Sequence, residues 1–179
     1  MKIKNYMKKN IALIGHMGSG KSVIGSLIAK KLEYKHIDSD NIIEKLTKKT
    51  INDLFQIYGE DGFREIEKKT ILNLQKEKKM ILSLGGGSIL TKEVRDFLKN
   101  NFITIFLDID VETLVDRLKN SHKRPLLLNE NIENKIKKLD KDRRKFYLAA
   151  DIIIGKYENP SQTLSTFLDE YKKINAKNT

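Results

Sequence analysis

Short runs of apolar residues recur along the chain, and polar or charged stretches separate them. The first run, residues 11–14, is apolar at every position, which is typical of a strand buried on both faces of a parallel sheet. Similar runs predict four more strands, in chain order residues 34–37, 80–84, 102–107 and 152–154.

Between these runs the apolar residues follow a helical period instead. Four of them lie on one face of an amphipathic helix after the first strand: Ile24, Leu27, Ile28 and Leu32. Further helical patterns occupy residues 94–98, 111–118, 132–147 and 164–171. The stretch from 41 to 79 is too long for one crossover helix, and it indicates an insertion of several helices.

The turn between the first strand and the first helix carries a complete motif. Residues 15–22 match the phosphate-binding pattern G-x-x-x-x-G-K-[ST] at every fixed position. Its glycines let the backbone N–H groups point at phosphate oxygens, and the helix that begins near Lys21 directs its positive end to the same place. Lys21 would reach the β- and γ-phosphates, and the Ser22 hydroxyl would ligate Mg²⁺. The chain is therefore predicted to bind a nucleoside triphosphate.

Alternating strands and helices predict an α/β fold, a doubly wound five-stranded parallel sheet flanked by helices. The length of 179 residues is that of one domain, so we expect a single domain over residues 1–179. Within it, residues from about 38 to 79 would form a helical substrate-binding insertion. Residues from about 119 to 130 would form a mobile lid.

Composition excludes several classes of protein. The chain has no cysteine, so it holds no disulfide and no thiolate metal site. No apolar run approaches the roughly 18 residues of a membrane span, and the N-terminal residues lack the apolar stretch of a signal peptide. We expect a cytoplasmic protein without a membrane partner.

The formal charge of +11 suggests nucleic acid, but the kind of basic residue argues against it. Only six of the 35 basic residues are arginine, and the lysines occur in pairs beside acids, which is typical of a solvated surface. Few aromatic residues lie among the basic clusters, as base stacking would require. We expect no nucleic-acid partner. In such a chain, an arginine indicates a need for its planar, bidentate guanidinium group.

Two carboxylates, Asp38 and Asp40, lie at the end of the second strand, where open α/β sheets bind ligands. One could hold a metal ion through water while the other accepts a proton from a substrate hydroxyl. The alternative is a helix N-cap formed by Ser39 or Asp40.

Three consecutive glycines, Gly85, Gly86 and Gly87, follow the third strand. They indicate either backbone pressed against a ligand or a loose turn, and their place at the carboxyl end of a strand favours the ligand.

Arg64 and Glu67 lie three residues apart in a helical pattern and are therefore neighbours. Either Glu67 orients Arg64 toward a substrate carboxylate, or the two form a surface ion pair that contributes little.

A polar stretch and a proline interrupt the helical period after Arg117. With Arg124 before Pro125, this segment is predicted to be the lid that excludes water during phosphoryl transfer. The alternative is a surface loop with two exposed arginines. The three histidines, His16 among them, lack the spacing of a metal or nucleophilic site and are expected to be structural or incidental.

Together these features resemble the shikimate kinases, small bacterial enzymes related to nucleoside monophosphate kinases, over residues 11–168. The phosphate loop is common to many enzymes. The ordered set of D-x-D, F-R-x-x-E, G-G-G and R-P is specific to this family.

The resemblance implies ATP as co-substrate and one Mg²⁺ ion, held by Ser22 and, through water, by Asp38. It implies that Arg117 stacks on adenine and that residues 158–160 cover the other side of the base. The implied nucleotide-binding residues are Gly18, Ser19, Gly20, Lys21, Ser22, Val23, Arg117 and Pro160.

The resemblance also implies that Asp40 binds shikimate hydroxyls and acts as general base. Arg64, held by Glu67, would bind the shikimate carboxylate, and the backbone of Gly85, Gly86 and Gly87 would pack against its ring. Arg124 would reach into the closed active site. The implied catalytic residues are Lys21, Asp40 and Arg124.

The second arginine for the carboxylate is ambiguous. The family has R-x-x-x-Y-x-x-x-A before the last strand, and Arg143 and Tyr147 keep the first spacing. Ala150, however, comes one residue early, so Arg144 could take part instead. Helical spacing favours Arg143.

The implied reaction is ATP-dependent phosphorylation of the shikimate 3-hydroxyl, giving shikimate 3-phosphate and ADP on the route to chorismate and aromatic amino acids. The alternative is another small-molecule kinase of the same fold, such as a gluconate kinase. We expect the protein to act as a monomer.

Overall fold

The computed structural model describes residues 10–119, 132–155 and 159–176. Its core is one parallel five-stranded sheet in the order β2-β3-β1-β4-β5. The strands are β1 (Asn10–Ile14), β2 (Lys35–Asp38), β3 (Met80–Ser83), β4 (Phe102–Leu107) and β5 (Ile152–Ile154). The predicted doubly wound sheet is confirmed, with strand ends within one residue of the expected ones.

Seven α-helices and two 3₁₀ helices connect the described strands or follow them. The α-helices are α1 (Lys21–Leu32), α2 (Ser39–Thr47), α3 (Ile51–Leu72), α4 (Lys92–Asn101), α5 (Val111–Lys119), α6 (Ile132–Tyr147) and α7 (Pro160–Ala176). The 3₁₀ helices are η1 (Asn73–Lys76) and η2 (Ser88–Leu90). The predicted insertion thus consists of α2, α3 and η1, and α3 bends at Gly59. No helix within the described ranges is long and apolar enough to cross a membrane.

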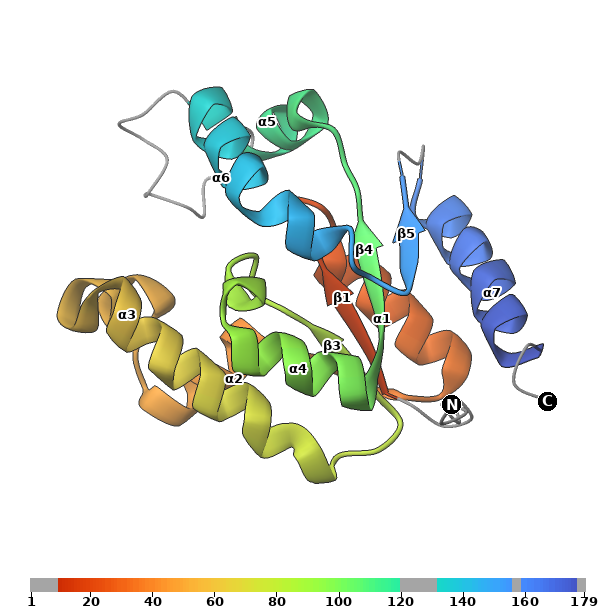
Figure 1. Cartoon of the computed structure of the whole chain (residues 1–179), viewed down its shortest axis with the longest axis horizontal. Helices are drawn as coiled ribbons and strands as arrows, with labels where there is room; N and C mark the ends of the chain where they lie inside the picture. Colours follow the sequence, from red (N-terminus) through yellow and green to blue (C-terminus); the bar gives the residue numbers. More distant parts are fainter. Residues whose placement is uncertain (1–9, 120–131, 156–158, 177–179) are drawn as a thin grey trace.

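Alternate side chains of β1, β3 and β4 enter two different apolar clusters, as strand geometry requires. One face of the sheet packs against α1 and α7, where Ile11 and Leu13 meet Ile28 and Phe167. The other face packs against α4 and the ends of α3 and α6, in a cluster that includes Tyr147. Figure 1 shows these helices on the two sides of the sheet, with α5 and α6 beyond the carboxyl ends of the strands.

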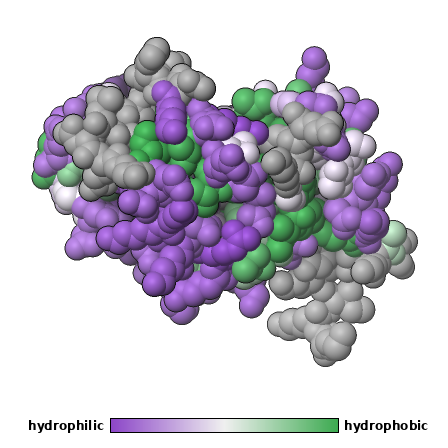
Figure 2. Space-filling model, turned by 90° about the horizontal axis from the view of Figure 1, so that it is seen from above, coloured by the Kyte–Doolittle hydropathy of each residue, from purple (hydrophilic) through white to green (hydrophobic). Residues whose placement is uncertain are grey.

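The polar surface agrees with the lysine-rich composition. In the view onto the carboxyl ends of the strands, most of the described surface is hydrophilic (Figure 2). Several lysines form ion pairs with acids one turn away on exposed helix faces, as in Lys92–Asp96, Lys137–Glu133 and Lys173–Glu170. Such exposed pairs contribute little to stability, so the lysines act chiefly as solvated surface.

The contact between α1 and the sheet leaves no room for a side chain at Gly25. A Cβ there would lie 2.7 Å from His36 Nε2 and Ser83 Oγ and 2.9 Å from Leu13 Cδ1. We therefore predict that Gly25→Ala lowers the free energy of unfolding by about 1–3 kcal/mol, although alanine favours a helix. Denaturant unfolding measures this change.

The matched control is Ser26→Ala, which adds no volume at the next, exposed position of the same helix. Equal stability of the two variants would show that α1 can move away from the sheet without cost.

Candidate active site

The phosphate loop follows β1 at the centre of the sheet. Gly15, Gly18 and Gly20 have φ angles of 140°, 78° and 90°, a region that residues with a side chain rarely adopt. Gly20 is the N-cap of α1 and provides no side-chain hydrogen bond to the first N–H groups of that helix. Those donors and the positive end of the helix dipole therefore face the loop, which is the arrangement that binds phosphate.

Lys21, the first residue of α1, places its ammonium group over this loop. Its Nζ donates to the carbonyl oxygens of Gly15 at 2.9 Å and His16 at 2.7 Å. The cation thus lies against carbonyl groups at the start of the loop.

Ser22, on the first turn of α1, meets Asp38 at the end of β2. Ser22 Oγ donates to Asp38 Oδ2 at 2.7 Å, while Asp38 Oδ1 accepts from the backbone N–H of Asp40 at 3.1 Å and of Asn41 at 3.4 Å. The helix cap that the sequence offered as the alternative is present but was assigned to the wrong residue, because Asp38 caps α2 instead of Ser39 or Asp40. The reason is that α2 begins one residue earlier than the sequence suggests, at Ser39.

These two side chains fit a magnesium ion. Both offer hard oxygen donors, and Mg²⁺ is commonly held by one or two protein oxygens together with water and phosphate. No cluster of three or more His, Cys, Asp or Glu side chains suited to a metal occurs among the described residues. An all-protein metal cage is therefore absent from that part of the chain.

Arg64 and Glu67 form a buried pair. Arg64 Nη1 donates to Glu67 Oε2 at 2.7 Å, and Ser88 Oγ donates to Glu67 Oε1 at 2.5 Å. The Glu67 side chain is 1% exposed and that of Arg64 is 17% exposed, which excludes the surface ion pair that the sequence allowed. A carboxylate buried in this way fixes the guanidinium that it contacts.

The triple-glycine loop, residues 85–87, lies against this pair and against Asp40. A Cβ on Gly85 would lie 2.8 Å from Asp40 Oδ1 and 2.9 Å from Glu67 Oε1, and a Cβ on Gly87 would collide with the Arg64 guanidinium. A Cβ at Gly85 or Gly87 would therefore force charged side chains to move, so the loop is closely packed by its surroundings.

Arg143 and Arg144 occupy different environments, although they are adjacent on α6. Arg143 is 7% exposed, and a Cβ on Gly86 would lie 3.4 Å from its Nη1. Arg144 forms a two-bond ion pair with Asp108 after β4, with distances of 3.1 and 2.9 Å. The side chain of Arg143 therefore lies against the triple-glycine loop, whereas that of Arg144 faces the end of β4.

The two arginines at the loop, Arg64 and Arg143, retain hydrogen-bonding capacity. The Nε atom of each is buried and has no hydrogen-bond partner among the described residues. Two such cations beside Gly86 and Gly87 suit an anionic ligand.

The remaining predicted site residues lie in or beside the phosphate loop, at the start of α7, or outside the described ranges. Arg117 Nη1, near the end of α5, donates to the Gly18 carbonyl at 3.2 Å, and Ser19 is fully buried in the loop. Val23 is 56% exposed on the first turn of α1, and Pro160 is the first residue of α7. Arg124, Pro125, Glu158 and nearly all of the predicted lid lie outside the described residues.

Two residues, Tyr147 and Arg95, make contacts in or next to the triple-glycine loop that the sequence did not predict. Tyr147 donates its hydroxyl to the Gly86 carbonyl at 2.6 Å, and burial raises the pKa of Tyr147 to about 12, so the hydroxyl remains a donor. Arg95 donates to the carbonyls of Ile89 and Leu90 after the triple-glycine loop, and its guanidinium lies 4.1 Å from the ring centre of Phe146. The contacts of Tyr147 with Gly86 and of Arg95 with Phe146 join segments far apart in sequence, so no local pattern marks them.

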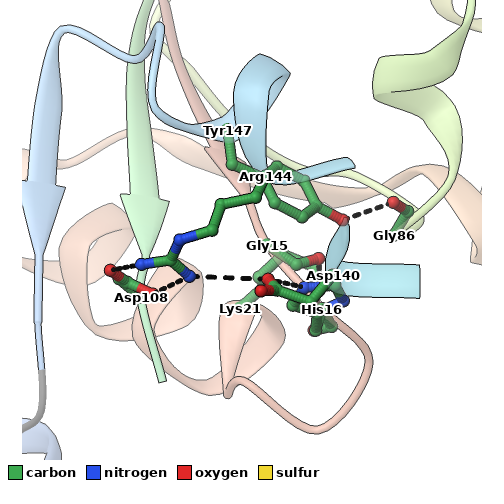
Figure 3. A network of polar contacts seen from close by, with 8 residues as sticks. All are labelled: Gly15, His16, Lys21, Gly86, Asp108, Asp140, Arg144 and Tyr147. Atoms are coloured by element: carbon green, nitrogen blue, oxygen red, sulfur yellow. Dashed lines mark hydrogen bonds and ion pairs between the residues drawn. The ribbon is translucent and has the colours of Figure 1, made fainter. Parts of the chain in front are cut away.

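His16 is also more than incidental to the packing. It is 4% exposed, and its Nε2 lies 2.8 Å from Asp140 Oδ1 on α6 (Figure 3). Burial is the main cause that lowers the pKa of His16, and the nearby cations Arg143 and Lys21 lower it further. The hydrogen bond to Asp140 and the negative charge of that carboxylate act in the opposite direction.

Comparisons with known proteins give a consistent result. The shikimate kinase family model matches residues 17–172. A shikimate kinase of Bartonella henselae is 40% identical over 169 residues, covering 92% of this chain and 80% of the relative.

Solved structures show the same likeness. The structure of shikimate kinase from Acinetobacter baumannii in complex with shikimate has a TM-score of 0.86 and 34% identity, covering 94% of each chain. A gluconokinase from Sinorhizobium meliloti has a TM-score of 0.59 at 15% identity, covering 95% of each chain, which is a likeness of fold alone.

The lowered pKa of His16 gives a stability prediction. A buried histidine that is held neutral binds fewer protons in the folded than in the unfolded chain, so stability rises with pH. The free energy of unfolding should be fully retained above the ordinary pKa of 6.5 and decline as the pH falls through the lowered value.

Chemical unfolding of the wild type and of His16→Gln between pH 5 and 8 would measure this slope. We expect a smaller slope in the variant, with a residual contribution from His36, whose pKa burial also lowers. Identical slopes would exclude His16 as a source of the pH dependence.

Proposed function

Because this chain belongs to the shikimate kinase family, we propose that it transfers the γ-phosphoryl group of ATP to the 3-hydroxyl of shikimate, giving shikimate 3-phosphate and ADP. One observation carries this proposal beyond the family match. Arg64 and Arg143 both lie at the triple-glycine loop, with the carboxylate of Asp40 beside them. An acceptor that carries both a carboxylate and hydroxyl groups meets complementary chemistry at this loop.

On the nucleotide side, the phosphate-loop amides at the start of α1 would hold the phosphates, and Lys21 would balance their charge. Arg117 lies beside Gly18, which supports its proposed contact with adenine. We extend this binding set to the remaining predicted residues, which are Ser19, Gly20, Ser22, Val23 and Pro160.

The proposed metal ion is Mg²⁺, with Ser22 and Asp38 as the residues that hold it. Their oxygens meet at 2.7 Å at the edge of the phosphate loop, which supports this assignment. When bound, such an ion neutralises negative charge on the β- and γ-phosphate oxygens.

On the acceptor side, Arg64 and Arg143 would bind the shikimate carboxylate and the glycine backbone would lie against its ring. Asp40 would accept the proton from the reacting hydroxyl. Arg124 is proposed to stabilise charge on the transferring group, from the part of the chain that the structure does not describe.

We also propose that a single chain forms the whole site, acting as a cytoplasmic monomer that binds neither nucleic acid nor membrane. Residues 38–79 are proposed as the substrate-binding insertion of a single kinase domain, because Asp40, Arg64 and Glu67 lie within it. Arg64, Arg95, Arg117 and Arg144 each contact a specific group, which leaves mainly lysine for the exposed basic surface and supports the absence of a nucleic-acid partner.

The substrate is tested by ADP release with Mg·ATP and either shikimate, gluconate or no acceptor. We expect turnover with shikimate alone. Turnover with gluconate instead would keep the fold and overturn the proposed acceptor.

Asp40→Asn should lower kcat at least about a hundredfold with shikimate, because the amide cannot accept the hydroxyl proton. Asp61→Asn is the matched control, since Asp61 is an exposed carboxylate on the same insertion. Equal activity of the two variants would contradict the role of Asp40 as general base.

A third comparison separates the two adjacent arginines. Arg143→Lys should raise the KM for shikimate about ten- to a hundredfold, because lysine cannot form the paired hydrogen bonds of a guanidinium. Arg144→Lys should leave that KM within about twofold, since its side chain faces Asp108. The opposite order of effects would assign the carboxylate contact to Arg144.

A further inference from the structure

Helix α6 contacts both loops of the site through side chains two turns apart. Asp140 contacts His16 of the phosphate loop, with 2.8 Å between the Oδ1 and Nε2 atoms. Tyr147 donates its hydroxyl to the carbonyl of Gly86 in the triple-glycine loop, at 2.6 Å. The rings of His16 and Tyr147 also meet edge to face, with 5.0 Å between their centres. Figure 3 shows these contacts converging beneath α6.

Asp140 is itself held in place. Arg144, one turn further along α6, lies 3.5 Å from Asp140 Oδ1 through its Nη1 atom. The same guanidinium is fixed by its two bonds to Asp108 after β4. His16, Asp140, Arg144 and Asp108 therefore form a continuous polar chain from the phosphate loop through α6 to the sheet.

The direction of the hydrogen bond follows from its chemistry. An ionised carboxylate only accepts, so the Nε2 atom of His16 carries the proton and donates it to Asp140. A neutral imidazole suits this place, because Lys21 and Arg143 already bring positive charge near it. The hydrogen bond between His16 and Asp140 therefore forms with a neutral imidazole ring.

Holding the His16 side chain also fixes its backbone. The His16 carbonyl accepts from Lys21 Nζ at 2.7 Å and from the Ser19 N–H at 3.2 Å. A Cβ on Gly86 would lie 3.4 Å from the Gly15 carbonyl oxygen and 3.5 Å from the Met17 nitrogen, so the two loops are in contact. A shift of α6 would change the distance between them.

We propose that His16 and Asp140 are positioning residues for phosphoryl transfer. Their contact holds the phosphate loop to α6, and Tyr147 of the same helix holds the triple-glycine loop. This inference rests on the proposed function, because it assigns the donor to one loop and the acceptor to the other. Phosphoryl transfer depends chiefly on alignment of donor and acceptor. Loosening one loop would therefore slow the chemical step more than it weakens binding of either substrate.

The test compares kcat and both KM values for His16→Leu, Asp140→Ala and the double variant. We expect each single variant to lower kcat about tenfold or more, with each KM within about threefold, since misalignment acts mainly on the transition state. The double variant should be no slower than the slower single variant, because both remove the same contact.

Two controls separate positioning from general loss of structure. His16→Gln offers a neutral N–H donor of similar reach and should restore most of kcat. Asp142→Asn removes an exposed carboxylate two residues away on α6 and should leave kcat unchanged. Thermal melting of every variant shows which proteins are folded, and Asp140→Ala carries the test if His16→Leu is not, since Asp140 is partly exposed.

A folded Asp140→Ala with wild-type kcat would overturn the inference, as would equal losses in Asp142→Asn or a fall in melting temperature alone. Wild-type activity is measured in the same assay. If the wild type turns over shikimate, a negative result concerns the positioning pair alone. If it does not, the proposed function fails and the inference with it.

Discussion

The site depends on one steric constraint, which is that residues 85–87 are all glycine and carry no side chains. At this turn the carboxylates of Asp40 and Glu67 and the guanidinium of Arg64 approach the backbone so closely that a Cβ at Gly85 or Gly87 would displace one of them. Charged groups can gather there because each has a partner, with Glu67 bonded to both Arg64 and Ser88. The parallel sheet supplies the rest, since it brings the carboxyl ends of β1, β2 and β3 to one edge.

The sequence predicted the features that depend on local pattern. The strands, the phosphate loop and the neighbouring Arg64 and Glu67 could be predicted because each is set by residues close together in the chain. The burial of Glu67 could not, because it depends on Ser88, which lies 21 residues away.

Features set by distant residues required the structure. The choice between Arg143 and Arg144 depends on Asp108, which lies 36 residues before Arg144 and draws its side chain toward β4. His16 was expected to be structural or incidental, but its contact with Asp140 could not be predicted, because Asp140 is 124 residues away and belongs to no motif. The helix cap was assigned to the wrong residue because one residue decides where a helix starts, and periodicity does not resolve that.

Asp38 serves two demands with its two oxygens, one capping α2 and the other bonded to Ser22. Serine, threonine or asparagine could satisfy the cap, because each has an oxygen that accepts from the first N–H groups of a helix. Only a carboxylate also brings negative charge to Ser22, as the proposed metal role requires. Folding alone would tolerate several residue types at position 38, but the proposed metal role tolerates only a carboxylate. The two requirements together therefore permit fewer substitutions than the helix cap alone.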